Sequence, residues 1–208
     1  MECTLCNNNS ILYSKSANKE YYKCSVCGSI CMHPLFYISS ENEKIRYQEH
    51  NNDVNDIGYQ KFVQPIIEGV TSNFNNKANG LDFGCGTGPV ITKLLQEKKF
   101  NITTYDPFFD NNLNALKNTY NFIVCCEVIE HFHHPLKEFK LLKALLKPKG
   151  KLYCMTDIFS ESINFKNWYY KNDNTHVIFY QENTFKWIQK HIGFSKVTIN
   201  NRLIIFEN

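Results

Sequence analysis

Three glycines at alternate positions mark a place where the backbone can lie directly against a ligand. Gly84, Gly86 and Gly88 follow the run Leu81-Asp82-Phe83. Glycine allows positive φ and keeps side chains away from the amides, so a strand-to-helix turn of this kind can bind a ligand through its main chain. A dinucleotide-binding loop would need Gly or Ala where Pro89 stands, and a phosphate-binding loop would end in Gly-Lys-Ser or Gly-Lys-Thr. Both nucleotide-binding patterns are therefore excluded.

Acidic side chains stand at the ends of two further strand-like runs. Asp106 follows the β-branched stretch 102–104 and precedes Pro107. It is therefore expected at the carboxyl end of a strand, where open α/β sheets bind ligands. The apolar run 122–126 leads into Glu127-Val128-Ile129-Glu130-His131. If this last segment forms a helical turn, its two glutamates and its histidine share one face.

In this order, the three motifs resemble those of the class I S-adenosylmethionine (SAM) dependent methyltransferases, over residues 57–208. In that family the glycine loop lies along the methionine part of the cofactor, and the acidic residue of the next strand accepts the ribose hydroxyls. For the glycines alone, an ordinary tight turn is the competing interpretation, which the two later motifs disfavour. The resemblance implies an enzyme with these SAM-binding residues: Asp82, Gly84, Cys85, Gly86, Gly88, Asp106, Pro107, Phe108, Cys126 and Glu127.

Methyl transfer is an in-line attack on the sulfonium methyl. The protein must align the nucleophile and, for oxygen, nitrogen or acidic carbon, remove its proton. The candidate catalytic residues are Glu130, His131 and His176. His176 ends the aromatic and polar stretch 168–176, which lies where the family places its substrate lid. The competing interpretation is a histidine that only fixes this loop through hydrogen bonds.

Two mechanisms remain open for these groups. In one, a second divalent cation acidifies a substrate hydroxyl and is bound by Glu127, Glu130, His131 and His176. Small-RNA 2′-O-methyltransferases and ubiquinone-pathway O-methyltransferases share a similar Glu-x-x-Glu-His pattern. In the other, the two glutamates position the cofactor loop, and His131 or His176 is a general base that needs no metal.

Four of the nine cysteines are spaced as in a zinc site. Two residues separate Cys3 from Cys6 and two separate Cys24 from Cys27, and 17 residues separate the pairs. Gly28 permits the tight knuckle behind the second pair. Residues 1–36 are therefore expected to form a zinc ribbon, in which the metal replaces a hydrophobic core. Because four thiolates close the coordination sphere, a structural metal is favoured over a catalytic one.

Residues 37–56 join this ribbon to the methyltransferase segment 57–208 and are polar, as in a linker. Tyr47 and the stretch 50–53 nevertheless offer more aromatic and hydrogen-bonding groups than a spacer requires. The segment is therefore also a candidate lid over the cofactor or the substrate.

The remaining pattern predicts an α/β fold. We expect a Rossmann-like, mostly parallel sheet with a C-terminal antiparallel hairpin, next to the small N-terminal ribbon. Helices are expected at about 59–74, 89–98, 135–146 and 182–191, with a turn at 147–150. Strands are expected at about 101–105, 122–126, 152–155, 197–199 and 203–206.

The segment between the second and third of these motifs is short. Only 15 residues separate Asp106 from Phe122, too few for the helix, strand and helix that the family usually has there. The third strand is expected to be missing or reduced, together with the acidic residue that recognises adenine. Phe108 and Phe109 are candidates to stack on the adenine ring instead; packing at the sheet edge is the alternative.

Composition and net charge limit the classes of binding partner. The 208 residues carry a formal charge of +3, too little to indicate nucleic acid binding. No signal peptide or membrane span is visible, so a cytoplasmic protein with reduced cysteines and no membrane partner is expected. The resemblance favours a small polar acceptor, such as a sugar, a quinone-like compound or another natural product, methylated on oxygen, nitrogen or carbon. RNA is the alternative, because ribbon-bearing rRNA methyltransferases exist, and a non-catalytic interaction module is the third hypothesis.

Overall fold

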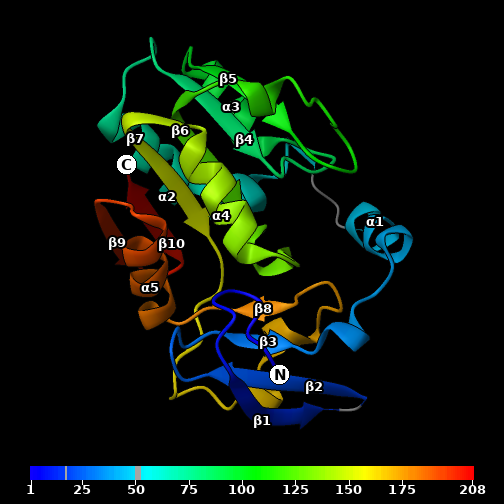
Figure 1. Cartoon of the computed structure of the whole chain (residues 1–208). Coiled ribbons are helices and arrows are strands. Elements are labelled where there is room, and N and C mark those ends of the chain that lie inside the picture. Colours follow the sequence, from blue (N-terminus) through cyan, green and yellow to red (C-terminus); the bar gives the residue numbers. More distant parts are fainter. Residues whose placement is uncertain (17, 50–52) are drawn as a thin grey trace.

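The computed structural model describes residues 1–16, 18–49 and 53–208, and within these ranges it contains two β-sheets (Figure 1). The larger sheet has six strands in the order β5-β4-β6-β7-β10-β9, and the smaller has four in the order β1-β2-β3-β8. Residues 50–52 of the expected lid lie outside the described residues. None of the helices in the described ranges is long and apolar enough to cross a membrane.

The larger sheet is mostly parallel and ends in an antiparallel hairpin, as the sequence predicts. Its strands are β4 (Asn79–Phe83), β5 (Asn101–Tyr105), β6 (Tyr120–Cys126), β7 (Leu146–Met155), β9 (Lys196–Asn200) and β10 (Leu203–Glu207). β4 pairs in parallel with β5 and β6, and β6 with β7. β10 runs antiparallel to both β7 and β9. The expected Rossmann-like α/β class is confirmed.

The short spacing between Asp106 and Phe122 has the predicted effect at one edge of this sheet. β5 lies at the edge, so no third strand follows it among the described residues. One boundary differs from the prediction: residues 147–150, expected as a turn, belong to β7, which already starts at Leu146. Leu146 pairs with Tyr120 and Lys151 pairs with Phe122, so the register shifts between these two pairs, and the additional residues 147–150 belong to β7.

Helices cover both faces of the larger sheet (Figure 1). They are α2 (Ile57–Asn73), α3 (Val90–Glu97), α4 (Pro135–Ala144) and α5 (Glu182–Ile192). Elsewhere the chain forms 3-10 turns at Pro34–Phe36, Ala115–Lys117, Ile129–His131, Phe165–Asn167 and Tyr169–Asn172. Phe122 and Val124 of β6 belong to the core formed with α2 and α3, whereas Ile123 and Cys125 belong to the core formed with α4 and α5. Because both faces of β6 are buried, the sheet rigidly positions Glu127 directly after it.

The smaller sheet contains the cysteine-bearing segment and one strand from far along the chain. Its strands are β1 (Ser10–Ser16), β2 (Lys19–Cys24), β3 (Ile30–Met32) and β8 (Ile178–Phe179), paired antiparallel. The helix α1 (Ser40–Gln48) follows, capped by the Ser39 hydroxyl, which accepts a hydrogen bond from the Asn42 amide. The expected linker thus contains a helix. The division into 1–36, 37–56 and 57–208 stays a prediction, and β8 crosses it by pairing with β3.

Candidate active site

A cavity of about 830 Å³ opens at the carboxyl ends of β4, β5 and β6 and is covered in part by α1. Ligands bind at this edge of open α/β sheets, and the volume suits a small-molecule site. Of the residues predicted for the site, ten line the cavity: Gly84, Cys85, Gly86, Asp106, Pro107, Phe108, Cys126, Glu127, His131 and His176. The described lining does not include Asp82, Gly88 or Glu130.

Asp106 joins the end of β5 to the glycine loop. Its Oδ2 accepts a hydrogen bond from the Gly86 amide at 3.0 Å. Its Oδ1 accepts from the amides of Phe108 at 2.8 Å and Phe109 at 3.0 Å. The carboxylate thereby fixes the loop and the two aromatic residues relative to each other at the cavity wall.

The glycine loop needs glycine for two physical reasons. Gly84 has a φ of 80° and Gly86 a φ of 62°, in the left-handed region that side chains disfavour. A Cβ atom on Gly84 would also lie 2.5 Å from Val128 Cγ2. The loop can therefore approach the end of β6 only without a side chain at position 84.

Asp82 lies behind the loop. Its Oδ2 accepts a hydrogen bond from the Thr92 hydroxyl at 2.7 Å, which ties the end of β4 to α3. Burial raises the pKa of this carboxyl to about 6. Asp82 therefore contacts the helix that follows the loop, and its predicted role in SAM binding would be exerted through the loop.

Glu127 pairs with an arginine that the sequence patterns do not single out. Arg202, in the turn between β9 and β10, donates to both Glu127 oxygens at 2.8 and 2.9 Å. The Tyr170 hydroxyl lies 3.1 Å from Glu127 Oε2. The Arg202 guanidinium also lies 5.6 Å from the centre of the Tyr170 ring. This cluster holds the aromatic loop against the end of β6.

Glu130 is fully buried behind Tyr170. One carboxyl oxygen accepts a hydrogen bond from the Tyr170 hydroxyl, and the other has no hydrogen-bond partner among the described residues. Burial raises the pKa of Glu130 to about 7, and burial together with the Glu130 charge raises that of Glu127 to about 7. Both carboxyls therefore titrate close to neutral pH.

The two predicted histidines lie side by side on the cavity wall, with ring centres 4.7 Å apart. His131 Nδ1 lies 3.0 Å from the Thr175 carbonyl, and His176 Nδ1 lies 2.7 Å from the Tyr170 carbonyl. Because a carbonyl oxygen only accepts, each Nδ1 carries the proton, and in the neutral rings Nε2 carries the lone pair. Burial lowers the pKa of His131 below its ordinary value.

A divalent cation could use part of this group. One oxygen of Glu130 and one nitrogen each of His131 and His176 lie within 4.8 Å of one another. A carboxylate and two imidazoles suit Mn²⁺, Fe²⁺ or Zn²⁺. Glu127, the fourth ligand expected from the sequence, is not in this group because its carboxylate faces Arg202.

Helix α1 connects the two walls of the cavity. The Tyr47 ring lies 5.6 Å from that of Phe108 and 5.2 Å from that of His131, measured between centres. Arg46 donates two hydrogen bonds to one Asp173 oxygen, at 3.1 and 2.8 Å. These contacts agree with a lid, which stays a prediction for the segment 37–56.

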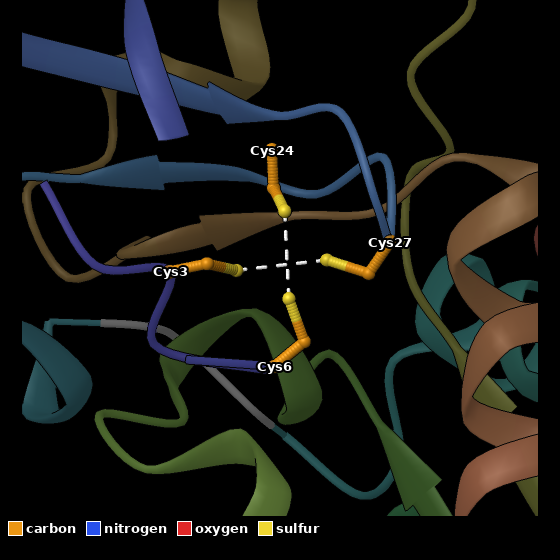
Figure 2. A group of neighbouring side chains, drawn as sticks. All are labelled: Cys3, Cys6, Cys24 and Cys27. Carbon is orange, nitrogen blue, oxygen red and sulfur yellow. Dashed lines mark hydrogen bonds between the residues drawn. The ribbon is translucent and has the colours of Figure 1, made fainter. Parts of the chain in front are cut away.

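The four predicted cysteines converge in the smaller sheet (Figure 2). The Sγ atoms of Cys3 and Cys27 lie 3.5 Å apart, and those of Cys6 and Cys24 lie 3.4 Å apart. Four sulfurs at about 2.3 Å around zinc would lie about 3.8 Å from one another. The donor set therefore fits one tetrahedral zinc ion.

Comparison with known proteins decides the family. Residues 57–199 match the family model described as a methyltransferase domain. This chain belongs to the class I SAM-dependent methyltransferases. The match covers the glycine loop, Asp106 and the histidine pair, and leaves the cysteine-bearing segment outside.

Two relatives of this methyltransferase are named ubiquinone biosynthesis O-methyltransferase. The one from Rickettsia canadensis (strain McKiel) is 31% identical over 137 residues, which are 52% of this chain and 57% of that protein. The one from Rickettsia bellii (strain OSU 85-389) is 32% identical over 138 residues, which are 52% and 56% of the two chains. The methyltransferase thus spans about half the length of the curated relatives it matches.

Two solved structures share its fold at low identity. A SAM-dependent methyltransferase from Archaeoglobus fulgidus has a TM-score of 0.55 and 16% identity, covering 72% of this chain and 94% of that one. The 1,6-didemethyltoxoflavin-N1-methyltransferase of Burkholderia thailandensis, solved with that compound and S-adenosylhomocysteine, has a TM-score of 0.54 and 11% identity, covering 95% and 98%.

Sequence reasoning missed Arg202, which contacts Glu127 of the cavity lining, and several lining residues such as Arg46 and His133. An arginine after two asparagines is typical of a turn, and its partner Glu127 stands 75 residues earlier in the chain. The contact arises because β10 lies beside β7, which in turn lies beside β6. An unpaired carboxylate at the end of β6 was the only available signal that a cation had to come from elsewhere.

Proposed function

We propose that this methyltransferase moves the methyl group of SAM to a hydroxyl oxygen of a small aromatic, quinone-like acceptor. The observation that carries the proposal is the His131–His176 pair, which lines the same cavity as the glycine loop and Asp106. A base at the cofactor cavity is what oxygen methylation requires. The name of the Rickettsia relatives supports oxygen and a quinone-like ring among the acceptors considered from the sequence.

The cofactor end of the cavity is the glycine loop with the end of β5. SAM, when bound, supplies an already activated methyl group. Amides of the loop would contact its methionine part, Asp106 would accept the ribose hydroxyls, and Phe108 would stack on the adenine ring. These residues then only need to hold and orient the donor, which is the larger part of catalysis for an activated group.

The acceptor end has aromatic walls: Tyr47, Tyr59, Phe62, Tyr169 and Tyr170. Flat rings bind between such side chains by stacking and edge contacts. RNA would require a basic channel, whereas the described lining has Arg46 as its single lysine or arginine beside five carboxylates: Glu43, Asp106, Glu127, Glu138 and Asp173. This charge balance favours a small acceptor over RNA.

Proton removal falls to the histidine pair. Nε2 of His131 or His176 would take the hydroxyl proton as the acceptor oxygen attacks the methyl carbon, because Nδ1 of each ring donates to a carbonyl. The lowered pKa of His131 keeps that ring neutral, and so able to accept a proton, at neutral pH.

Two metal ions enter the proposal. A structural zinc would be held by Cys3, Cys6, Cys24 and Cys27. The alternative to a histidine base is a divalent cation on Glu130, His131 and His176, which would acidify the acceptor hydroxyl.

The deciding experiment uses the purified full chain with methyl-labelled SAM and a panel of dihydroxyphenols, sugars and RNA. Transfer to a phenolic oxygen, located by mass spectrometry and NMR, is the expected result. Label in RNA would replace the proposal by its alternative. SAM binding without transfer to any acceptor would favour a non-catalytic module.

Replacement of the base provides the first testable prediction. His176→Ala should lower turnover by about a hundredfold or more while the SAM affinity stays nearly constant. His191→Ala is the matched control, because this exposed histidine also bonds a carbonyl through Nδ1, at 2.9 Å from Trp187 O, but lies outside the cavity lining. Its turnover should equal that of the wild type.

A chelator mild enough to leave the cysteine-bound metal in place then separates base from cation. Unchanged turnover favours the histidine base, and lost turnover, restored by Mn²⁺, Fe²⁺ or Zn²⁺, favours the cation. Activity that survives both His176→Ala and chelation would remove His176 from the reaction.

A further inference from the structure

The strand that follows His176 is also the fourth strand of the cysteine-bearing sheet. β8 pairs antiparallel with β3, with Ile178 opposite Cys31 and Phe179 opposite Ile30. The Met32 amide donates to the Val177 carbonyl at 2.8 Å. The loop that carries His176 is therefore hydrogen-bonded to the segment that lies next to the four cysteines.

The other side of the same loop is bonded to the turn after β6. The Val177 amide donates to the Glu130 carbonyl at 2.9 Å. His131 donates to the Thr175 carbonyl at 3.0 Å, and the Tyr180 hydroxyl donates to the Ile129 carbonyl at 2.7 Å. Residues 175–180 thus lie between β3 and the turn 129–131, and they set the relative position of the two histidines.

Gln181 ties the end of β8 to the cysteine knuckle itself. Its buried side-chain amide donates to the Gly28 carbonyl at 2.6 Å. The Gly28 amide donates in turn to the Cys24 carbonyl at 3.0 Å, in the turn that contains Cys27. Asn183 fills the space beside Gly28, where a Cβ atom would lie 2.4 Å from its Nδ2.

The cofactor end of the cavity has a different support. The amide of Gly84 donates to the Tyr105 carbonyl at 2.7 Å, and that of Gly86 donates to Asp106. Both contacts lie at the carboxyl ends of β4 and β5, away from the smaller sheet. Loss of order in the smaller sheet would therefore reach the histidine pair before it reaches the cofactor loop.

We infer that a metal ion at the four cysteines positions the His131–His176 pair through β3, β8 and Gln181, and so controls the acceptor end of the cavity while leaving the cofactor end intact. Residues 1–36 share their hydrophobic core with the larger sheet, and a metal at the four cysteines would tie the turn at residues 3–6 to the turn at residues 24–27. β8 has two residues and β3 has three, so neither would persist alone. The consequence for turnover rests on the proposed function; the positioning itself does not.

Hydrogen exchange of the full chain tests the positioning without any acceptor. The zinc-loaded protein is compared with protein stripped by a strong chelator and with stripped protein to which zinc is restored. Amides of 177–180 should lose protection by about tenfold or more, together with those of 21–32. The amides of Gly84 and Gly86 should keep theirs, and the SAM affinity should stay within about twofold.

Two outcomes would overturn the inference. Exchange that changes only within residues 1–33 would make the cysteine segment an independent module. Parallel loss of protection at Gly84 and of SAM binding would mean global unfolding. A protein that binds SAM but methylates nothing would contradict the proposed function and leave this result standing.

A substitution tests Gln181 as a positioning residue. Gln181→Glu replaces the donor by a carboxylate that cannot donate to the Gly28 carbonyl. The imidazole NMR resonances of His131 and His176 should shift, and the acceptor KM should rise by about tenfold, the scale of one lost buried hydrogen bond.

Gln189→Glu is the matched control at the other end of α5. Its side-chain amide donates to the Phe194 carbonyl at 2.9 Å and belongs to neither cavity wall nor smaller sheet. Both variants lose side-chain amide hydrogen bonds to main-chain carbonyls, but only Gln181→Glu should move the histidine resonances. Equal effects of the two, or unmoved resonances in Gln181→Glu, would contradict the inference.

Discussion

Asp106 holds the cofactor loop and faces the cavity at the same time. Its two oxygens accept three backbone hydrogen bonds, yet it remains part of the cavity lining. Asp106→Ala should weaken SAM binding by about 1.5 to 3 kcal/mol, the range of charge-assisted hydrogen bonds. Calorimetry measures this, with Asp110→Ala as a control at the same sheet edge but outside the described lining. Unchanged affinity in a folded Asp106→Ala protein would remove the ribose assignment.

Asp82 predicts a pH dependence of stability. Its pKa is about 6 in the folded chain against an ordinary 3.8, so between these values the folded state binds a proton that the unfolded chain has released. Its contribution to stability is therefore present at low pH and is lost as the pH rises through 6. Asp82→Asn removes this dependence.

Urea unfolding of wild type and Asp82→Asn measures the effect. The free energy of unfolding of the variant, relative to the wild type, should rise by about 1 to 2 kcal/mol from about pH 5 to about pH 8. The control is Asp110→Asn, a half-buried carboxylate at the same edge of the sheet. A pH-independent difference between Asp82→Asn and wild type would contradict the assigned pKa.

At the scale of elements, the glycine loop fits against the end of β6 only because position 84 has no side chain. Gly84→Ala combines a positive φ with a clash at Val128. If the loop contacts SAM as proposed, strain of about 1 to 3 kcal/mol in it corresponds to a loss of affinity of about tenfold or more.

Gly193→Ala separates the effect of the positive φ from that of the clash with Val128. Gly193 also has a positive φ, of 84°, but an added Cβ would meet nothing closer than Lys143 Cε at 3.8 Å. This variant should lose stability and keep the SAM affinity of the wild type, measured by calorimetry. If both variants bind SAM as the wild type does, the close approach of loop and β6 has no role in binding.

At the scale of the whole molecule, the two sheets share one hydrophobic core. Buried residues of the cysteine segment, such as Leu5 and Ile30, belong to the same cluster as Phe139 of α4 and Phe206 of β10. The cysteine segment is therefore packed into the methyltransferase fold. This arrangement is the reason why a metal at the four cysteines is expected to matter for the proposed acceptor site.

Metal analysis tests the cysteine site directly. Protein purified without added zinc should contain one zinc per chain, and Cys24→Ser should lower that content and loosen residues 1–36 while SAM still binds. Cys31→Ser is the matched control, because this buried thiol lies in the same sheet but outside the group of four. Equal zinc loss in both variants, or a Cys3–Cys27 disulfide in thiol-blocked protein, would contradict the four-cysteine assignment.

Local chemistry in the sequence was enough for most elements of the larger sheet and for placing the glycine loop next to Asp106. The alternating glycines before Pro89, the acidic end of β5 and the short spacing to β6 predict the fold class and the reduced third strand, because each depends on residues close together in the chain. The paired cysteines predict a metal site for the same reason. The early start of β7 at Leu146 escaped prediction because it depends on an irregular pairing with β6, in which residues 147–150 of β7 are additional.

The acceptor end was decided only by the tertiary structure. Arg202 reaches Glu127 because the last hairpin lies beside β7, and β8 joins the cysteine segment to the loop of His176. Glu130 and Gly88, predicted in the site, lie outside the cavity lining because Tyr170 covers the first and the loop turns away before the second. Residues that are 75 or more positions apart form no recognisable sequence motif, since only the packing of whole elements brings them together.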